Sequence, residues 1–319
     1  MKSFKYHHKK TNLSRVHLVW MLLMVGFVVG ILTPRGAHAQ ERRIIDVHLH
    51  ALSLKAFPAH VDTMAGYERP ESPQALRSRS IDQLERFNIV KAVTSGEPEL
   101  VKNYKEAAPN RIVQGLWIPI GLTGHSLRSY IDSLPQWHRQ GKFEVLGEVL
   151  TQYSGIAPDD PILEPMWSFA EKKNVPVGIH IGPTHPDSIT GYTPLAMDDV
   201  LAKHPNLKVY IMHAGYPHQE DMLNLLSEYP GVYVDIAGLR LLYPIEKVHQ
   251  YLKGLVSAGY AKRIMFGTDQ MLWPQSIKKS IRAIESANFL TEEQKQDIFY
   301  DNAARFLGIG KGKTLGAIE

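Results

Sequence analysis

The sequence contains no cysteine, so the protein forms no disulfide bond and offers no thiolate to a metal ion. Any metal site must therefore use nitrogen and oxygen ligands, from histidine and carboxylate side chains. Low-complexity tracts are also lacking. Of the 319 residues, 44% are hydrophobic and 21% are charged, which is the composition of a globular chain long enough for a large core.

Acidic residues are absent from the first 39 positions, which contain six basic residues: Lys2, Lys5, Lys9, Lys10, Arg15 and Arg35. Without this segment, the formal charge of +4 becomes a net charge of −2 for residues 40–319. A nearly neutral body gives no electrostatic reason to bind a polyanion, so we expect no nucleic-acid partner.

The same segment has the three parts of a secretory signal peptide. The basic stretch is followed by an apolar run of 15 residues, Leu18–Leu32, which is shorter than the roughly 20 residues that a membrane-spanning helix needs. Ala37-His38-Ala39 then places small residues where signal peptidase cleaves. We therefore expect a signal peptide over 1–39 and a periplasmic or secreted body over 40–319, without membrane contact after cleavage. An uncleaved anchor is the alternative.

Short apolar runs alternate with amphipathic helical patterns from residue 43 onward, which indicates parallel strands joined by helices. Strands are expected over residues 43–50, 90–95, 112–119, 144–148, 176–181, 208–214, 232–238 and 264–269. Helices are expected over 162–173, 221–227, 245–258 and 276–287, and from a capping box at Thr291 to Gly308. Eight such units in roughly 280 residues predict an α/β fold of the (β/α)₈ TIM-barrel type. A doubly wound open sheet is the alternative, but it usually has a glycine-rich turn after its first strand.

Histidines and carboxylates stand at the predicted ends of five strands, where a barrel of this kind has its active site. His48 and His50 end the first strand, and the two-residue alternation of a strand directs both to the same side. Four more residues end the fourth, fifth, sixth and eighth strands: Glu148, His180, His213 and Asp269. Any one of them could be a structural polar residue, but together they predict a metal site in the barrel mouth.

Several segments resemble the amidohydrolase superfamily, and the similarity extends from about residue 43 to residue 309. The segments are Ile45–His50, Gly178–His180, Lys208–Gly215, Phe266–Asp269 and Asn302–Leu307. They are most similar to the amidohydrolase-related branch that includes aminocarboxymuconate semialdehyde decarboxylase. The resemblance implies a deformed barrel that binds one or two divalent cations, with Zn²⁺ as the expected metal.

The resemblance also implies a role for each residue of the predicted site. Four residues would be metal ligands: His48, His50, His180 and Asp269. His213 would be a ligand in a two-metal site, or a catalytic acid–base residue in a one-metal site. Glu148 stands where many relatives have a carbamylated lysine, so it would bridge two metals or, with one metal, orient a ligand histidine.

The expected activity is hydrolysis of an ester, lactone or amide bond in a small molecule, with Asp269 accepting the proton of the attacking water. One alternative is a non-oxidative decarboxylase, in which Arg240 beyond the seventh strand would bind the substrate carboxylate; the simpler interpretation of Arg240 is a surface residue at the start of a helix. Another alternative is a catalytically inactive metal-binding barrel that acts as a binding protein. The sequence carries no signal of oligomeric state.

The signal-peptide interpretation predicts that the exported protein begins at Gln40. Intact-mass analysis of the protein recovered after export should give the mass of residues 40–319. A mass that retains residues 1–39, found in the membrane fraction, would show that the segment is an uncleaved anchor.

Overall fold

The computed structural model describes residues 42–58, 60, 62, 66–182 and 192–310. The predicted signal peptide lies outside these residues. Within the described part of the chain, no helix is long and apolar enough to cross a membrane.

Eight parallel strands follow one another around a single sheet in sequence order, as predicted. The strands are β1 (Ile44–Ala51), β2 (Ile89–Gly96), β3 (Ile112–Ile118), β4 (Val145–Val149), β5 (Val177–His180), β6 (Val209–Met212), β7 (Tyr233–Asp235) and β8 (Ile264–Met265). The last three strands are shorter than predicted. In the case of β6, the chain leaves the extended conformation at His213, which begins a short 3₁₀ turn.

The sheet closes into a barrel because the segment after β8 is hydrogen-bonded to β1. The amide of Asp269 donates to the carbonyl of His48 at 2.8 Å. The amide of His50 in turn donates to the carbonyl of Gln270 at 3.0 Å. This closure confirms the predicted (β/α)₈ fold, and the doubly wound open sheet is wrong.

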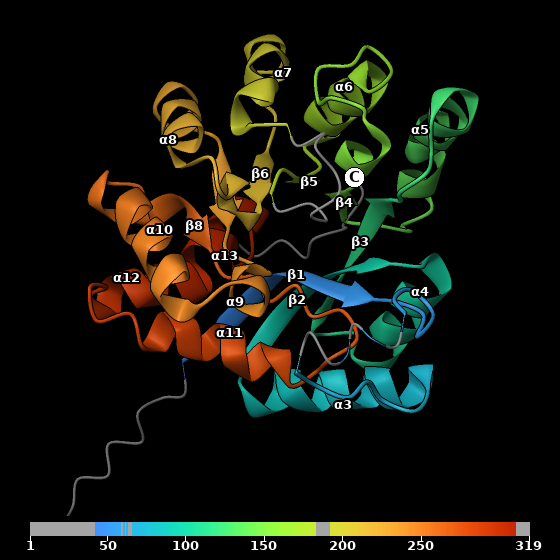
Figure 1. The fold of residues 1–319 in the computed structure, drawn as a ribbon. Coiled ribbons are helices and arrows are strands. Elements are labelled where there is room, and N and C mark those ends of the chain that lie inside the picture. The colour runs from blue at the N-terminus through green and yellow to red at the C-terminus, as the bar shows by residue number, and fades with distance from the viewer. Residues whose placement is uncertain (1–41, 59, 61, 63–65, 183–191, 311–319) are drawn as a thin grey trace, which may run out of the picture. The chain divides into compact units, whose positions relative to one another are not determined.

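Helices surround the strands (Figure 1). They are α3 (Pro73–Arg86), α4 (Pro98–Ala107), α5 (Gly124–Arg139), α6 (Glu164–Lys173), α7 (Asp198–Lys203), α8 (Gln219–Glu228), α9 (Leu239–Leu242), α10 (Ile245–Ser257), α11 (Ser276–Glu285), α12 (Glu292–Gln296) and α13 (Asn302–Leu307). The predicted capping box at Thr291 is present at the start of α12. A π-helical segment, Asp297–Asp301, joins α12 to α13, which ends at Gly308 in the left-handed conformation that glycine favours.

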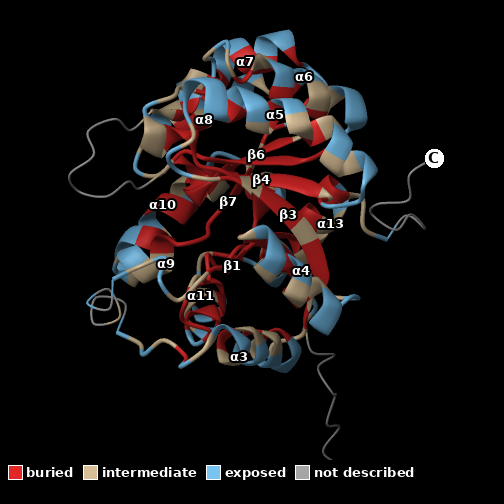
Figure 2. Ribbon diagram, turned by 90° about the vertical axis from the view of Figure 1, so that its right-hand side faces the viewer, coloured by how far each residue is buried: buried red, intermediate tan, exposed pale blue. Residues whose placement is uncertain are grey.

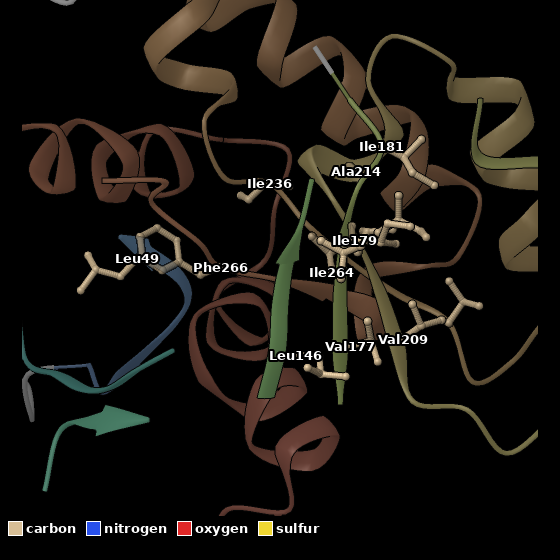
Figure 3. Close-up of a cluster of buried hydrophobic side chains, with 14 of the residues drawn as sticks. Leu49, Leu146, Val177, Ile179, Ile181, Val209, Ala214, Ile236, Ile264 and Phe266 are labelled. Atoms are coloured by element: carbon tan, nitrogen blue, oxygen red, sulfur yellow. The ribbon is translucent and has the colours of Figure 1, made fainter. Parts of the chain in front are cut away.

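The larger hydrophobic core lies between the strands and the helices. Val177, Ile179 and Ile181 all belong to it, and Figure 3 shows them along β5 among neighbouring apolar side chains. The strands are buried, whereas the helices expose their outer faces (Figure 2). Because side chains alternate along a strand, the residues between these three must face the inside of the barrel.

A second cluster fills the inside of the barrel near α13 and includes Val47, Tyr210 and Met212. The hydroxyl of Tyr210 donates to the carbonyl of Val47 at 3.0 Å. A Cβ atom at Gly178 would collide with the Tyr210 side chain, so glycine is required at this position. His180, two residues further along β5, therefore also faces inward, beyond the packed floor that this cluster forms.

Candidate metal centre

The structure brings all six predicted site residues together at the ends of the strands. They are His48 and His50 on β1, Glu148 on β4, His180 on β5, His213 directly after β6, and Asp269 after β8. Each is at most 9% exposed. Two overlapping sets of their donor atoms lie close enough together to hold a metal ion: one from His48, His50 and Asp269, and one from His48, Glu148 and His213.

Four donor atoms lie together on the β1 side of the cluster. The Nε2 atoms of His48 and His50 are 3.1 Å apart. Oδ1 of Asp269 lies 3.6 Å from the first nitrogen and 3.1 Å from the second. Oε2 of Glu148 lies 3.6 Å and 3.4 Å from the same two nitrogens. Ligands at 2.0–2.2 Å around a tetrahedral cation are separated by about 3.4 Å, so these donors fit one divalent cation.

The second carboxylate oxygen of Glu148 faces the other two histidines. Oε1 lies 2.5 Å from Nδ1 of His180 and 3.4 Å from Nε2 of His213. These two nitrogens are themselves 3.0 Å apart. Three protein donors are the number found in catalytic zinc sites, which keep their fourth position for water or substrate.

Asp235, at the end of β7, orients two of these histidines. Its Oδ2 lies 3.0 Å from Nδ1 of His48. Its Oδ1 accepts hydrogen bonds from the amides of His213 and Ala237 at 2.8 and 3.0 Å. The carbonyl of Ala237 lies 2.9 Å from Nδ1 of His213. With Nδ1 donating in both rings, the Nε2 lone pairs of His48 and His213 point into the cluster, as metal ligands require.

Asp46 holds the two closing segments of the barrel together beneath the site. Its Oδ1 accepts from the amides of His48 and Thr268, both at 3.0 Å. Its Oδ2 accepts from the hydroxyl of Thr268 at 2.6 Å. Burial raises the pKa of Asp46 to about 7, while the hydrogen bonds from Thr268 oppose this rise. Asp46 thereby fixes His48 relative to Asp269.

Sequence reasoning assigned no role to Asp46 or Asp235. A carboxylate inside an otherwise apolar predicted strand was the available signal, because a buried charge needs partners. The partners come from β1, β6 and the segment after β8, and only the closed barrel places them in contact.

Two site residues have backbone conformations that are uncommon for residues other than glycine. The φ angle is +57° at His213 and +52° at Asp269. Such left-handed conformations cost on the order of 1 kcal/mol and concentrate at functional sites. Tyr210 and Met212 already point into the barrel, so strict alternation would turn His213 outward. The left-handed conformation instead brings its ring into the cluster.

The two carboxylates of the cluster are ionised. Burial alone would raise the pKa of Glu148 and Asp269, but attraction from His48 together with hydrogen bonds from the other cluster histidines outweighs it and holds both pKa values below their usual range. Burial lowers the pKa of His50, yet its hydrogen bonds with Asp269 and Glu148 raise it to about 9. A buried group of anions and imidazole nitrogens is the chemical environment that binds a divalent cation.

Arg240 does not lie among the cluster residues. It is on α9, where its Nη1 donates to the carbonyl of Tyr243 at 3.0 Å. Its side chain lines a cavity whose described lining contains none of the six cluster residues. The ring of Tyr153, in contrast, contacts that of His180, with 4.8 Å between their centroids.

Parallel (β/α)₈ barrels with clustered histidines and carboxylates at the strand ends are typical of metal-dependent enzymes. The amidohydrolase family model matches residues 45–309. The chain belongs to this family, and it is a metal-dependent enzyme of the amidohydrolase type. Among proteins with curated functions, none matches the sequence.

Solved structures confirm the fold. An uncharacterised TIM-barrel protein from Bordetella bronchiseptica is 18% identical, with a TM-score of 0.67 over 83% of this chain and 98% of that one. A probable 2-pyrone-4,6-dicarboxylic acid hydrolase from Acinetobacter baumannii, with citric acid bound, is 17% identical, with a TM-score of 0.59 over 83% and 99%. A 2,6-dihydroxybenzoate decarboxylase in complex with 2,6-dihydroxybenzoate is 14% identical, with a TM-score of 0.58 over 84% and 99%. At these identities the similarity concerns the fold alone.

The role of Asp235 can be tested with Asp235→Asn. In this variant the new side-chain oxygen should accept hydrogen bonds from the backbone amides of His213 and Ala237, as Oδ1 of Asp235 does. The new NH₂ group would then face Nδ1 of His48. His48 would then carry its proton on Nε2, the atom directed at the cluster. We expect metal affinity to fall about 10- to 100-fold, measured by chelator competition. The exposed Asp199→Asn is the control, and unchanged affinity in Asp235→Asn would contradict this role.

Proposed function

We propose that the protein is an exported hydrolase that cleaves an ester, lactone or amide bond of a small molecule with two divalent cations, most simply Zn²⁺. The observation that carries this proposal is the position of Glu148. Its Oε2 faces His48 and His50, and its Oε1 faces His180 and His213. Each of these four histidine nitrogens lies within 3.6 Å of the Glu148 oxygen that it faces. A bridging carboxylate between two cations has this arrangement.

The proposed ligands divide into two sets around Glu148. One cation would bind His48, His50 and Asp269, and the other would bind His180 and His213. Divalent cations in such sites lower the pKa of water from 15.7 toward about 7 and polarise the carbonyl group under attack. The protein holds the ligands rigidly, because Asp235 and Asp46 fix the histidine and carboxylate positions.

Asp269 is the proposed proton acceptor. Its carboxylate remains ionised at neutral pH despite burial, so it can take a proton from the attacking water. It can then give that proton to the leaving alkoxide or amine, which restores the ionised form. Asp269 is also the most exposed of the six cluster residues, at 9%, which supports contact with a substrate.

Hydrolysis is preferred to decarboxylation because of Arg240. Decarboxylation at this site would need a cation to hold the substrate carboxylate, and Arg240 was the candidate. Its guanidinium group lines a different cavity. An inactive binding protein is the remaining alternative, but six buried ionisable side chains are costly to bury and serve no purpose in a barrel without metal chemistry.

Turnover tests this proposal directly. His48→Ala, His180→Ala and Asp269→Ala should each lower kcat/KM at least about 100-fold on the best substrate of an ester, lactone and amide panel, because each change removes a proposed ligand. Circular dichroism should remain native-like, and the exposed His125→Ala should retain wild-type turnover. Release of CO₂ from an acid substrate would favour the decarboxylase, and metal content without turnover would favour the binding protein.

Metal stoichiometry tests the bridging role of Glu148. Wild-type protein under metal-replete conditions should hold about two cations per chain, measured by plasma mass spectrometry. Glu148→Gln should lose at least one of them, because a neutral amide bridges cations poorly, while the exposed Glu99→Gln should lose none. A wild-type value near one would overturn the bridging role and make His213 an acid–base residue.

A further inference from the structure

A cavity of about 500 Å³ is bounded by α9, the start of α10, α11 and the chain around Tyr67. Helices α9 and α11 lie side by side in both overall views (Figures 1 and 2). The polar lining consists of Tyr67, Arg240, Gln275, Lys278, Lys279, Arg282 and Ser286. Four of these side chains are cationic, and none in the described lining is acidic.

The four cations have no carboxylate partners within the described part of the chain. Among the described residues, none of Arg240, Lys278, Lys279 and Arg282 forms an ion pair, although many other lysines and arginines of the barrel do. Arg240 and Lys279 are only partly exposed. Four unpaired positive charges around one concave surface repel one another, and this repulsion has to be offset by solvent or by an anion.

The sequence of α11 separates its cations from its buried face. Ile277, Ile281 and Ile284 are buried, and Lys278 and Arg282, four residues apart, lie together on the adjoining face. Glu285 is the acidic residue of this helix, and its carboxylate is paired with Arg42 at 2.8 Å. The helix therefore contributes positive charge to the cavity without neutralising it.

The pKa of Lys279 responds to the positive charge gathered around the cavity. Partial burial and the nearby charge of Arg240 both lower its pKa. The Lys279 ammonium group also lies 5.9 Å from the centre of the Tyr67 ring. Arg240 is held in place by its hydrogen bond to the carbonyl of Tyr243. The two cations that reach the cavity from different elements are thus fixed close together.

We propose that this cavity binds a small molecule that carries two or more phosphate or carboxylate groups. Guanidinium and ammonium groups are the side chains that recognise such anions, and the amide of Gln275 and the hydroxyls of Tyr67 and Ser286 add neutral donors. A volume of about 500 Å³ is within the range of small-molecule sites. The site does not depend on the proposed hydrolytic function, because none of its described lining residues belongs to the metal centre.

Isothermal titration calorimetry on the metal-loaded protein tests this site, with pyrophosphate and propane-1,2,3-tricarboxylate as probes and acetate as a singly charged control. The wild type should bind a multivalent probe, and K278Q/R282Q should bind it at least about tenfold more weakly, because half of the cations are removed. Binding should also weaken between about 50 and about 500 mM NaCl, since salt screens partly exposed charges. Preference between the two probes distinguishes phosphate from carboxylate ligands.

Two control variants separate this site from the rest of the protein. K172Q/K173Q removes the same net charge from the exposed end of α6 and should leave the affinity unchanged. Glu148→Gln should also leave it unchanged, because a probe in the cavity does not touch the metal centre. Loss of binding in Glu148→Gln but not in K278Q/R282Q would place the probe on the metals and overturn the proposal. Absence of binding by the wild type at millimolar probe would overturn it as well.

Discussion

The metal centre depends on one electrostatic constraint: two carboxylates and four imidazoles share a space that is almost closed to water. Burial of each carboxylate is unfavourable by itself, and the histidines lower the pKa values of Glu148 and Asp269 enough to keep them ionised. The imidazole nitrogens must also present lone pairs to the same space. A divalent cation satisfies both requirements, whereas the apolar side chains of a packed core would satisfy neither.

The surrounding barrel is organised to keep these groups in place. Asp46 and Asp235 are completely buried, and each accepts hydrogen bonds from more than one segment of the barrel. Their burial is tolerated because backbone amides, the Thr268 hydroxyl and the His48 ring form hydrogen bonds with their oxygens. Rigid strands and these buried acceptors determine the histidine orientations, which leaves the loops beyond the strands free to determine which substrate enters.

Sequence reasoning was successful where the signal is local. Continuous apolar runs identified all eight strands, and alternation along β1 correctly grouped His48 with His50, since Leu49 packs in the outer core. The partnership of Asp235 with His48 joins residues 187 positions apart and needs the closed barrel. The inward turn of His213 follows from a single left-handed φ angle, which a short apolar run followed by histidine does not indicate.

Helix α9 shows how the metal centre and the basic cavity can share a boundary while differing in chemistry. Gly238 precedes α9 and lies against the cluster, because a Cβ atom there would be 2.6 Å from Oδ2 of Asp269. Arg240, two residues later, lines the cavity. One short helix therefore contacts an anionic centre at its start and a cationic site along its side. Once two divalent cations are bound, their charge would outweigh that of the two carboxylates, so an acidic ligand could bind at either site: by coordination to the metals at the centre, or by guanidinium and ammonium groups in the cavity.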